Sequence, residues 1–507
     1  MMANSPLELC MAYADLRSII TLLITAVLAV AIKRRYLSPL SDIPGPFFAS
    51  ITRFWQIRTL LQGDSLNVIY GLHQQHGPFV RIAPNEISVC HRDAPRKLLL
   101  TALHKDNWYR AGALPDYRFQ TTLSITDPKA KVARSRHLLH GYSTTNLLRS
   151  EARIDALFGQ LLDWLDRFAD TKHPMDLDKF FTFAAADITG EVLFSKPFGF
   201  LSSGTDIDDT LARSHGIVGI GTCAGYFPWL NKLVANPFVT WTGVLPFRLI
   251  FVTAMNAISE RQARWGSEEE KPSTGPSDVL TQWFQAHAQG KITLRDVQAQ
   301  TTLGVTAGTD AMSTGLQSFV YYTIRHASAW ERCREEVRSS QREYGRCKDR
   351  VVSFADAQTL PYLQACIKES LRLFGPLGTG LPRVAPEGGT RVGDRVFPEG
   401  TTLAIHPYSM MRDKSIWGPD ANDFNPDRWL DEKASAELEH YYMPFGLGYA
   451  ACPGINLAKI ELSKMAASIV RDYDIRQVDP HQEWSYEAYF NTLPHSWPVH
   501  VTKVANE

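Results

Sequence analysis

The sequence predicts a mainly α-helical fold with a small β portion, and three observations support this prediction. Apolar residues recur at helical spacing from 147 to 168, which is typical of an amphipathic helix. Thr293 and Asp296 have the spacing of a capping box, the pairing that begins many helices. Between 382 and 407, glycines and prolines interrupt short apolar runs, and this pattern favours β-hairpins.

The same signals predict where the main elements begin and end. We expect a long helix from about 293 to 325, and a second helix beyond 328, because Ser328 and Glu331 repeat the capping-box spacing. Residues 401–405 read as a strand. The low-complexity run 268–276 predicts a solvated connection between two helical regions.

Composition and charge narrow the class of protein. The chain has 507 residues, of which 44% are hydrophobic and 21% charged, as in a globular protein with a sizeable core. A disordered chain, a collagen-like fibre and a polytopic membrane protein are excluded. Lys and Arg total 53, as do Asp and Glu, so the charge gives no support for a nucleic-acid partner. Seven scattered cysteines without a C-x-x-C pair argue against a disulfide framework or a zinc site, and favour a reducing compartment.

The amino terminus contains one apolar run. Residues 18–32 carry no charge and are bracketed by Arg17 and by Lys33-Arg34-Arg35. A helix of this length spans about 22 Å, less than the roughly 30 Å of a hydrocarbon core. Three interpretations compete: a secretory signal, a buried core helix and a single membrane anchor. We favour the anchor, with the basic residues keeping the following chain on the cytoplasmic side.

This interpretation divides the chain into an anchor with its linker, residues 1–42, and one large domain, residues 43–507. The large domain begins with Ile43-Pro44-Gly45-Pro46. Two prolines around a glycine cannot continue a helix. We expect this segment to act as a hinge that orients the large domain on the membrane surface.

The segment 445–454 (FGLGYAACPG) is the most informative part of the sequence. A cysteine in a glycine-rich loop is ambiguous by itself, because cysteine is often buried as a small apolar residue. The glycines would also let the backbone pass close to a flat group and turn N–H groups towards a sulfur anion, which tunes a bound metal. Residues 455–462 read as a helix, and a helix N-terminus stabilises a thiolate. Cys452 is therefore a candidate metal ligand.

The segment resembles the haem-binding loop of the cytochrome P450 family, F-G-x-G-x-R-x-C-x-G. The matching positions are Phe445, Gly446, Gly448, Cys452 and Gly454. The resemblance implies the P450 fold, in which haem b (iron protoporphyrin IX) lies between a long central helix and the helix of the cysteine loop, with Cys452 as the iron ligand. Ala450 departs from the pattern, because the family has an arginine there that pairs with a haem propionate.

Two further motifs of the family follow in the expected order. Glu369 and Arg372 match E-x-x-R and share one helix face, and residues 424–429 resemble the region that supplies a second arginine, here Arg428. The resemblance implies that the three side chains form a buried network that fixes the cysteine loop. Each pair alone could equally be a solvated ion pair worth about 0–1 kcal/mol.

Haem contacts outside the loop are implied at three more residues. Arg383 lies in a run, 381–389, that together with 423–429 resembles the fungal secondary-metabolite branch of the family, including pisatin-demethylase-like enzymes. Lys131 stands where many members have histidine, and Arg136 could compensate for an arginine that is Ser135 here. The alternative for these residues is a basic, solvated helix face.

The oxygen-activation segment departs from the family's A-G-x-D/E-T-T at a chemically important place. Asp310 is retained as the acidic member of the proton-delivery pair, but Ala311 replaces the threonine. Ser313 and Thr314 are poor substitutes because each neighbouring position on a helix turns by about 100°. We expect an ordered water or a substrate hydroxyl to carry the protons. Gly308 predicts either a local helix bulge beside the haem or close helix packing.

The resemblance implies a membrane-anchored haem-thiolate monooxygenase of the endoplasmic reticulum, with its catalytic domain in the cytoplasm. It would oxidise a lipophilic secondary metabolite with O2, using electrons that NADPH-cytochrome P450 reductase supplies. The alternatives are a haem-thiolate isomerase or dehydratase that needs no NADPH, and a non-catalytic haem sensor. Four stretches are expected to contact the substrate: 114–122, 227–247, 305–311 and 490–493.

Overall fold

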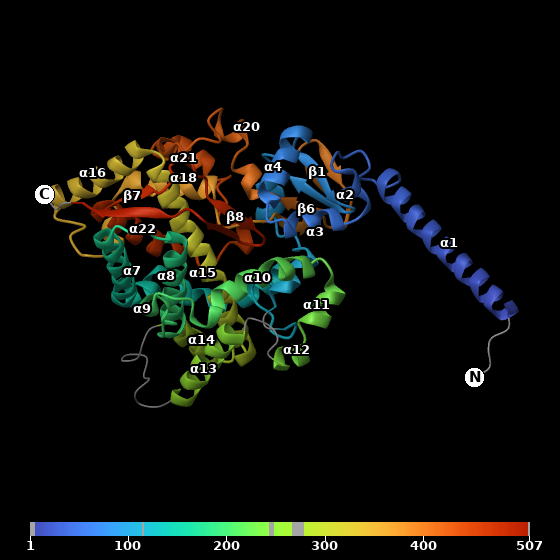
Figure 1. Cartoon of the computed structure of the whole chain (residues 1–507), viewed down its shortest axis with the longest axis horizontal. Coiled ribbons are helices and arrows are strands. Elements are labelled where there is room, and N and C mark those ends of the chain that lie inside the picture. The colour runs from blue at the N-terminus through green and yellow to red at the C-terminus, as the bar shows by residue number, and fades with distance from the viewer. Residues whose placement is uncertain (1–5, 114–115, 243–247, 266–277, 505–507) are drawn as a thin grey trace.

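Helices dominate the computed structural model, which describes residues 6–113, 116–242, 248–265 and 278–504 (Figure 1). The central element is α15 (Leu294–Ile324), which is buried over most of its length. The expected capping box is present at its start, where Thr293 and Asp296 each accept the other's backbone N–H through a side-chain oxygen. The run 268–276 lies outside the described residues. A mainly α fold with a small β portion is confirmed.

The helices before α15 build the amino-terminal part and one side of the molecule. They are α1 (Pro6–Tyr36), α2 (Phe47–Ile51), α3 (Phe54–Leu61), α4 (Ser65–His76), η1 (Pro95–Leu100), η2 (Asn107–Gly112), α5 (Pro128–Leu138), η3 (Leu139–Tyr142), α6 (Thr144–Leu147), η4 (Leu148–Ser150), α7 (Glu151–Thr171), α8 (Leu177–Phe194), α9 (Phe200–Ser203), η5 (Ile207–Asp209), α10 (Thr210–Ala224), α11 (Pro228–Val234), α12 (Pro237–Thr242), α13 (Arg248–Arg264) and α14 (Val279–Ala288).

The helices after α15 include the two that carry the sequence motifs, α18 and α22. They are α16 (Ala327–Tyr344), α17 (Phe354–Ala357), α18 (Pro361–Leu373), α19 (Pro407–Met410), α20 (Lys414–Trp417), η7 (Pro426–Trp429), α21 (Glu432–Leu438), η8 (Gly448–Ala450) and α22 (Ile455–Asp472). The main hydrophobic core forms where α15 packs against α8, α18 and α22, with α7 packed on α8.

The β portion consists of one four-stranded sheet and three two-stranded ribbons. The sheet has the order β1 (Phe79–Ala83), β2 (Glu86–Val89), β6 (Thr402–Ile405), β3 (Leu381–Val384), with β2 and β6 parallel and the other pairs antiparallel. The ribbons pair β4 (Thr390–Val392) with β5 (Arg395–Phe397), β7 (Tyr473–Gln477) with β10 (Val499–Lys503), and β8 (Ser485–Ala488) with β9 (Thr492–His495). A second, smaller core lies under the sheet.

Two expectations about local structure need correction. The second helix begins at Ala327, with His326 before it, so Ser328 lies inside α16 and caps nothing. Glu331, the expected partner of that cap, instead accepts a hydrogen bond from Arg334 at 3.0 Å. The amphipathic helix expected from 147 starts at Glu151, after the short turns of α6 and η4.

Close packing explains why two positions are occupied by glycine. At Gly308, α15 continues as a regular helix, and an added Cβ would come within 2.7 Å of the Thr189 hydroxyl on α8. The glycine therefore permits helix packing, and the bulge that was one of two expectations is not present. At Gly45, an added Cβ would lie 2.4 Å from the carbonyl oxygen of Arg81. The Pro-Gly-Pro segment is thus packed against β1, and Arg81 donates its N–H to the carbonyl of Pro44 at 2.8 Å.

The first helix, α1, extends well beyond the apolar run and projects from the rest of the chain (Figure 1). Its residues 16–36 are long and apolar enough to cross a membrane, and none of the most apolar window is buried inside the molecule. At about 1.5 Å per residue, this 21-residue stretch spans about 32 Å. The length deficit of the 18–32 run is therefore made up by its flanking residues.

Candidate active site

Cys452 lies in the loop that leads into α22, two residues before Gly454, the residue that precedes the helix. The loop is closed by the Cys452 N–H, which donates to the carbonyl of Phe445 at 2.8 Å. Gly448 needs a glycine for two reasons: its φ is +68°, and a Cβ would come within 2.3 Å of the Leu99 carbonyl on η1. The sequence of the loop thus lets it fold tightly against its neighbours while the cysteine remains accessible.

Cys452 is exposed, in contrast to Cys90, Cys223, Cys333, Cys347 and Cys366, which are buried. Enough protein nevertheless surrounds it for burial to raise the pKa of its thiol, against the opposing influence of the Gly454 N–H and the charge of Lys131. A side chain that is accessible yet surrounded by protein faces a space inside the molecule. The Gly454 N–H that is directed at the sulfur would stabilise a thiolate.

The accessible face of α15 provides the other boundary of this space. Ala307 is exposed and Ala311 half-buried, although most residues of α15 are buried. The two alanines are four residues apart and so share one face of the helix. Small side chains at both positions leave room beside the middle of α15, the helix that packs against α22.

A cluster of buried cations lies beside the cysteine loop. Lys105, Lys131 and Arg383 are each less than 10% exposed, and none of them makes an ion pair with any residue that the structure describes. Lys131 donates to the Tyr449 carbonyl at 2.5 Å, while Lys105 and Arg383 face each other in a β-bridge. Both also contact the Tyr109 ring, at 4.8 and 5.8 Å from its centroid.

The pKa values in this cluster reflect burial and mutual repulsion. Burial lowers the pKa of Lys105 to about 7, and the charges of Arg383 and Lys131 act in the same direction. The pKa of Lys131 is also lowered, by burial and by Arg383, although the charge of Cys452 opposes this. Cations without carboxylate partners are costly to bury. The cluster is therefore suited to an anionic group that carries more than one charge.

Two buried polar atoms beside this cluster also lack partners within the described residues, namely Nε of Arg383 and the hydroxyl of Ser135. Together with the accessible cysteine and the open face of α15, they fit a flat, dianionic group such as haem.

Lys105 was not singled out from the sequence, where it is a lone lysine with no motif around it. Arg136 is exposed on α5, apart from the buried Lys131 and Ser135, and its neighbour Arg134 pairs with Asp296.

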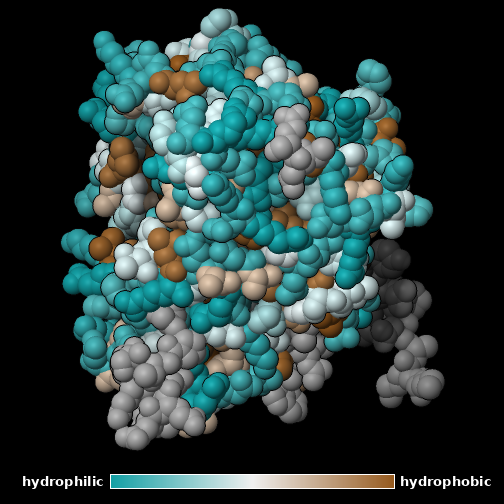
Figure 2. All heavy atoms as spheres, turned by 90° about the vertical axis from the view of Figure 1, so that its left-hand side faces the viewer, coloured by the Kyte–Doolittle hydropathy of each residue, from teal (hydrophilic) through white to brown (hydrophobic). Residues whose placement is uncertain are grey.

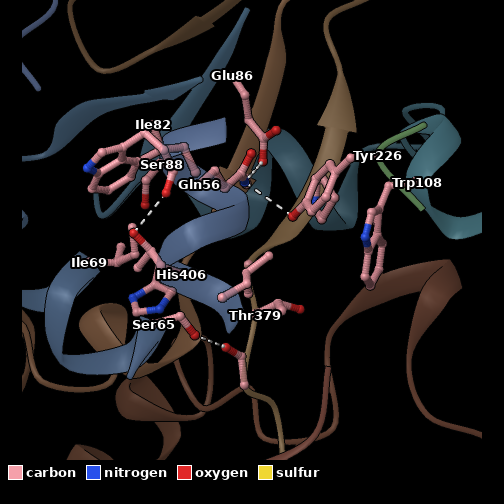
Figure 3. Close-up of a pocket in the computed structure, with 17 residues that line it drawn as sticks. Gln56, Ser65, Ile69, Ile82, Glu86, Ser88, Trp108, Tyr226, Thr379 and His406 are labelled. Carbon is pink, nitrogen blue, oxygen red and sulfur yellow. Dashed lines mark hydrogen bonds between the residues drawn. The ribbon is translucent and has the colours of Figure 1, made fainter. Parts of the chain in front are cut away.

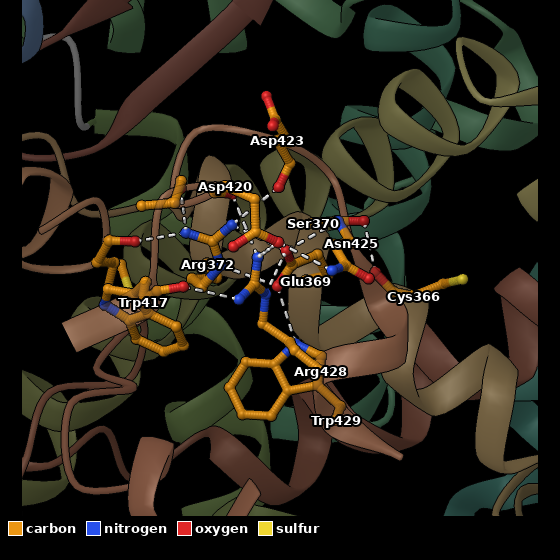
Figure 4. A network of polar contacts seen from close by, with 12 residues as sticks. Cys366, Glu369, Ser370, Arg372, Trp417, Asp420, Asp423, Asn425, Arg428 and Trp429 are labelled. Carbon is orange, nitrogen blue, oxygen red and sulfur yellow. Dashed lines mark hydrogen bonds and ion pairs between the residues drawn. The ribbon is translucent and has the colours of Figure 1, made fainter. Parts of the chain in front are cut away.

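Glu369, Arg372 and Arg428 lie together in a buried network (Figure 4). Glu369 receives two hydrogen bonds from Arg372 at 2.8 Å and one from Arg428 at 2.9 Å. It also accepts the Asn425 N–H and the Trp429 indole N–H. The five donors satisfy one fully buried carboxylate.

The network fastens the segment before the cysteine loop to α18. Arg372 donates to the carbonyls of Met411, Ala421 and Asp423, and Arg428 donates to that of Trp417. Trp429 in turn packs on Tyr442, with ring centroids 5.2 Å apart, just before the loop begins. Arg372, Arg428 and Trp429 all bind Glu369. Through them the chain from 411 to 445 is held in place.

Asp310 is buried on α15 and is hydrogen-bonded by His215, whose Nε2 lies 2.9 Å from its Oδ1. Sequence reasoning missed His215, which belongs to α10. The hydroxyls near Ala311 are engaged elsewhere: Ser313 with Thr182 at 2.8 Å, and Thr314 with the Thr492 carbonyl at 2.7 Å. The structure therefore agrees that neither hydroxyl substitutes for the missing threonine.

A separate, small cavity lies between α3, the four-stranded sheet and the segment after α10 (Figure 3). Gln56 bridges its walls, donating to Glu86 at 3.1 Å and to the Tyr226 hydroxyl at 3.2 Å. Its volume is about 40 Å³, far below the roughly 300–1,000 Å³ of a typical ligand pocket. It can hold a few water molecules and does not serve as the substrate site.

The stretches expected to contact a substrate are only partly described. Residues 114–115 and 243–247 lie outside the described residues, and with them Leu114 and Phe247. Phe490 packs against Trp108, with ring centroids 5.6 Å apart. Phe227 lies against Phe54 on the outer side of the molecule, and Trp229 is 67% exposed.

Comparison with known proteins agrees with this geometry. The family model described as Cytochrome P450 matches residues 43–493. The chain is 28% identical over 471 residues to a pisatin demethylase of Fusarium vanettenii, with 90% of each chain covered. It is 29% identical over 483 residues to the cytochrome P450 monooxygenase gsfF of Penicillium aethiopicum, with 92% of this chain and 94% of that one covered.

Proposed function

The chain belongs to the cytochrome P450 family and is a P450 monooxygenase, and we propose that it is a membrane-anchored enzyme that oxidises a lipophilic fungal secondary metabolite. In this proposal the substrate is hydroxylated, demethylated or oxidatively coupled with O2. The observation that carries the proposal is the accessible Cys452 inside the molecule, next to three buried cations that have no carboxylate partner among the described residues.

Side chains of suitable charge are already in place to hold haem b. Cys452 would bind the iron, and Lys105, Lys131 and Arg383 would face the propionates. When bound, the haem supplies the activation of dioxygen and the electron transfer, with the thiolate as electron donor. The family has an arginine at the position of Ala450. In this proposal Lys105, which lies just before η2, supplies the missing cation to the same cluster.

Lys105 gives a direct test of the propionate site. Changing Lys105 to Met is expected to weaken haem affinity about 10- to 100-fold, because a hydrogen bond to a charged group contributes about 1.5–3 kcal/mol. Since its pKa of about 7 must rise beside an anion, wild-type haem affinity should fall as the pH is raised above that value. The measurement is the rate of haem transfer to excess apomyoglobin between pH 6 and 9.

Lys129→Met is the matched control, because Lys129 is exposed on the same helix as Lys131. It should leave both the affinity and its pH dependence unchanged. Equal haem release from the Lys105 and Lys129 variants would show that Lys105 does not face a propionate.

Several features support a membrane anchor, which we propose lies in the endoplasmic reticulum. Residues 16–36 can cross a membrane, and Lys33, Arg34 and Arg35 end that helix. An apolar surface continues beside it, formed by exposed residues of α2, α3, α11 and α12: Phe47, Phe48, Phe54, Trp229, Leu233 and Phe238. The opposite face is mainly hydrophilic, with apolar residues scattered singly (Figure 2). This polarity suits a domain that rests on a membrane with its far side in water.

The electrons would come from NADPH through a separate NADPH-cytochrome P450 reductase. A lipophilic substrate fits the alanines that line the open face of α15, because small apolar side chains offer contact area and no hydrogen bonds.

One observation favours a second candidate function. Ala311 removes the usual proton-delivering hydroxyl, which an isomerase or dehydratase would not need. Asp310 is retained and paired with His215, which favours oxygen activation. The two functions differ in their requirement for NADPH and dioxygen.

The decisive experiment reconstitutes the full-length protein with reductase in phospholipid vesicles and screens a metabolite panel for low-to-high-spin shifts. Metabolites that shift the spectrum are then incubated with ¹⁸O₂, with and without NADPH. We expect products that contain one ¹⁸O or have lost hydrogen or a methyl group, and only in the presence of NADPH. Turnover that is equally fast without NADPH would instead establish an isomerase or dehydratase.

A further inference from the structure

We propose that His215 is a proton relay that supplies Asp310, and that this relay replaces the hydroxyl missing at Ala311. The inference rests on the proposed monooxygenase function, since only oxygen activation needs protons delivered at this place. His215 acts through Asp310 and not on the reacting atoms, so it is a positioning residue in the strict sense. Neither the sequence motif nor the family match identifies it.

The pair joins a partly accessible side chain to a largely buried one. The His215 side chain is 30% exposed, whereas that of Asp310 is only 10% exposed. Their contact at 2.9 Å joins α10 to the middle of α15, next to the half-buried Ala311. A proton taken up from water at the imidazole can therefore reach the buried carboxylate through one hydrogen bond.

The position of His215 is fixed by packing on both sides of α10. An added Cβ at Gly219 would meet the Tyr489 ring at 2.8 Å, and one at Gly225 would meet the Trp108 ring at 2.7 Å. The start of the helix is capped by Asp206, whose carboxylate accepts the N–H groups of Leu211 and Ala212, each at 3.0 Å. The imidazole is thus held over Asp310 by the fold and not only by their own hydrogen bond.

Three carboxylates face the imidazole from three separate elements. Asp310 lies on α15, Asp206 precedes η5, and Glu487 belongs to β8. Burial lowers the pKa of His215, but the hydrogen bond to Asp310 and the charges of all three carboxylates outweigh it, so that the pKa lies above its ordinary value. The imidazole therefore keeps its proton to a higher pH than an isolated histidine does, and its Nε2 lies where that proton can pass to Asp310.

The relay conserves protons at each step. The imidazolium gives its Nε2 proton to Oδ1 of Asp310, which leaves a neutral imidazole and a carboxylic acid. The acid passes that proton to a water molecule or a substrate hydroxyl in the space beside Ala311 and becomes a carboxylate again. The imidazole recovers its proton from solvent, so one cycle moves one proton inward and leaves the protein unchanged.

A purely structural link between α10 and α15 is the competing explanation, and one variant separates the two. His215→Gln keeps a hydrogen-bond donor to Asp310 but cannot carry a proton inward. Arg213→Gln is the matched control, because Arg213 lies on the same helix and is exposed. If the role is structural, the glutamine introduced by His215→Gln should replace the histidine fully.

The test uses dioxygen as the only reagent, so it needs no identified substrate. The full-length haem protein is reduced, freed of reductant and mixed with oxygenated buffer, and its reoxidation is followed by absorbance between pH 5.5 and 8.5. Each molecule gives one electron to dioxygen and needs one proton to release it as a hydroperoxyl radical. We expect wild-type reoxidation to slow as the pH rises through the pKa of His215, and to be slower in D₂O.

His215→Gln is expected to reoxidise about 100-fold more slowly, the low end of what a positioned acid contributes, and to lose the pH dependence. Its reduced, carbon-monoxide-bound spectrum should equal that of the wild type, which shows that the haem site is intact. As a second readout, the pKa of ¹³C-labelled His215 measured by NMR in the ferrous carbon-monoxide form should drop in Asp310→Asn.

Wild-type rates and an unchanged pH profile in His215→Gln would overturn the relay. So would a His215 pKa that Asp310→Asn leaves unmoved. Neither readout depends on product formation. If the relay is supported while no metabolite is oxidised with NADPH, the proposed substrate class fails and the proton relay stands.

Discussion

A Cys452→Ala protein is expected to contain almost no haem and to oxidise nothing. The thiol of Cys452 is accessible within the molecule and receives an N–H from Gly454, an arrangement suited to an anionic iron ligand. Replacing a residue that only supports a ligand weakens metal binding about 10- to 100-fold. Removing the ligand itself should exceed that loss. The measurement is the haem-to-protein ratio of the purified, porphyrin-supplemented protein, together with its reduced carbon-monoxide spectrum.

Cys223→Ala is the appropriate control for loss of a thiol. Cys223 is buried on α10, and alanine is the residue most favourable to a helix. This variant should keep the haem content and spectrum of the wild type. A pigmented Cys452→Ala protein with an unaltered carbon-monoxide spectrum would show that the iron is held elsewhere, and the proposed function would fail with it.

Cys452 could be singled out as a candidate ligand because the features that suggest it are contained in one short loop. The glycines, the cysteine and the start of α22 are neighbours in the chain, so local rules link them: φ near +68° at Gly448 and the N–H groups at the start of a helix. The pairing of Glu369 with Arg372 is equally local, because residues three apart share a helix face. Assigning Arg428 to the same network also required the resemblance to the family, whose motifs occur in the same order along the chain.

His215 and Lys105 could not be predicted, because their partners are distant in the chain. His215 meets Asp310 across 95 positions, and Lys105 faces Arg383 through a bridge between two distant segments. No periodicity or spacing rule links such residues. One signal was present in the sequence: Ala311 lacks a hydroxyl beside a retained acid, which indicated that another group was required.

The local errors came from sequence patterns that are compatible with more than one local structure. Ser328 and Glu331 have the spacing of a capping box, but the helix had already begun at Ala327, and Glu331 is taken by Arg334. Gly308 had two possible reasons, and Thr189 on α8 decides for close packing. At Gly308 a tertiary contact selected one of two locally acceptable outcomes, whereas at Ser328 the earlier start of the helix and a contact within it did so.

The second large effect is expected at Glu369. Glu369→Gln keeps the shape of the side chain but removes the charge that faces Arg372 and Arg428, both nearly or fully buried. Removing one partner of a buried ion pair costs about 3–5 kcal/mol, because the remaining charge is left uncompensated. We expect a loss of this size in the free energy of unfolding, measured by urea denaturation of the haem-loaded protein, and slow loss of haem as the 411–445 segment loosens.

Glu439→Gln is the matched control, since Glu439 forms an exposed ion pair with Lys368, the residue next to Glu369 in the chain. That change should cost at most about 1 kcal/mol. If Glu369→Gln does not fold, Trp429→Phe removes a single donor from the same carboxylate and should cost about 1–3 kcal/mol. Because Trp429 also packs on Tyr442 before the cysteine loop, the Phe variant keeps an aromatic ring there while it removes the indole N–H. Costs indistinguishable from the Glu439 control in both variants would mean that the network does not hold the cysteine loop in place.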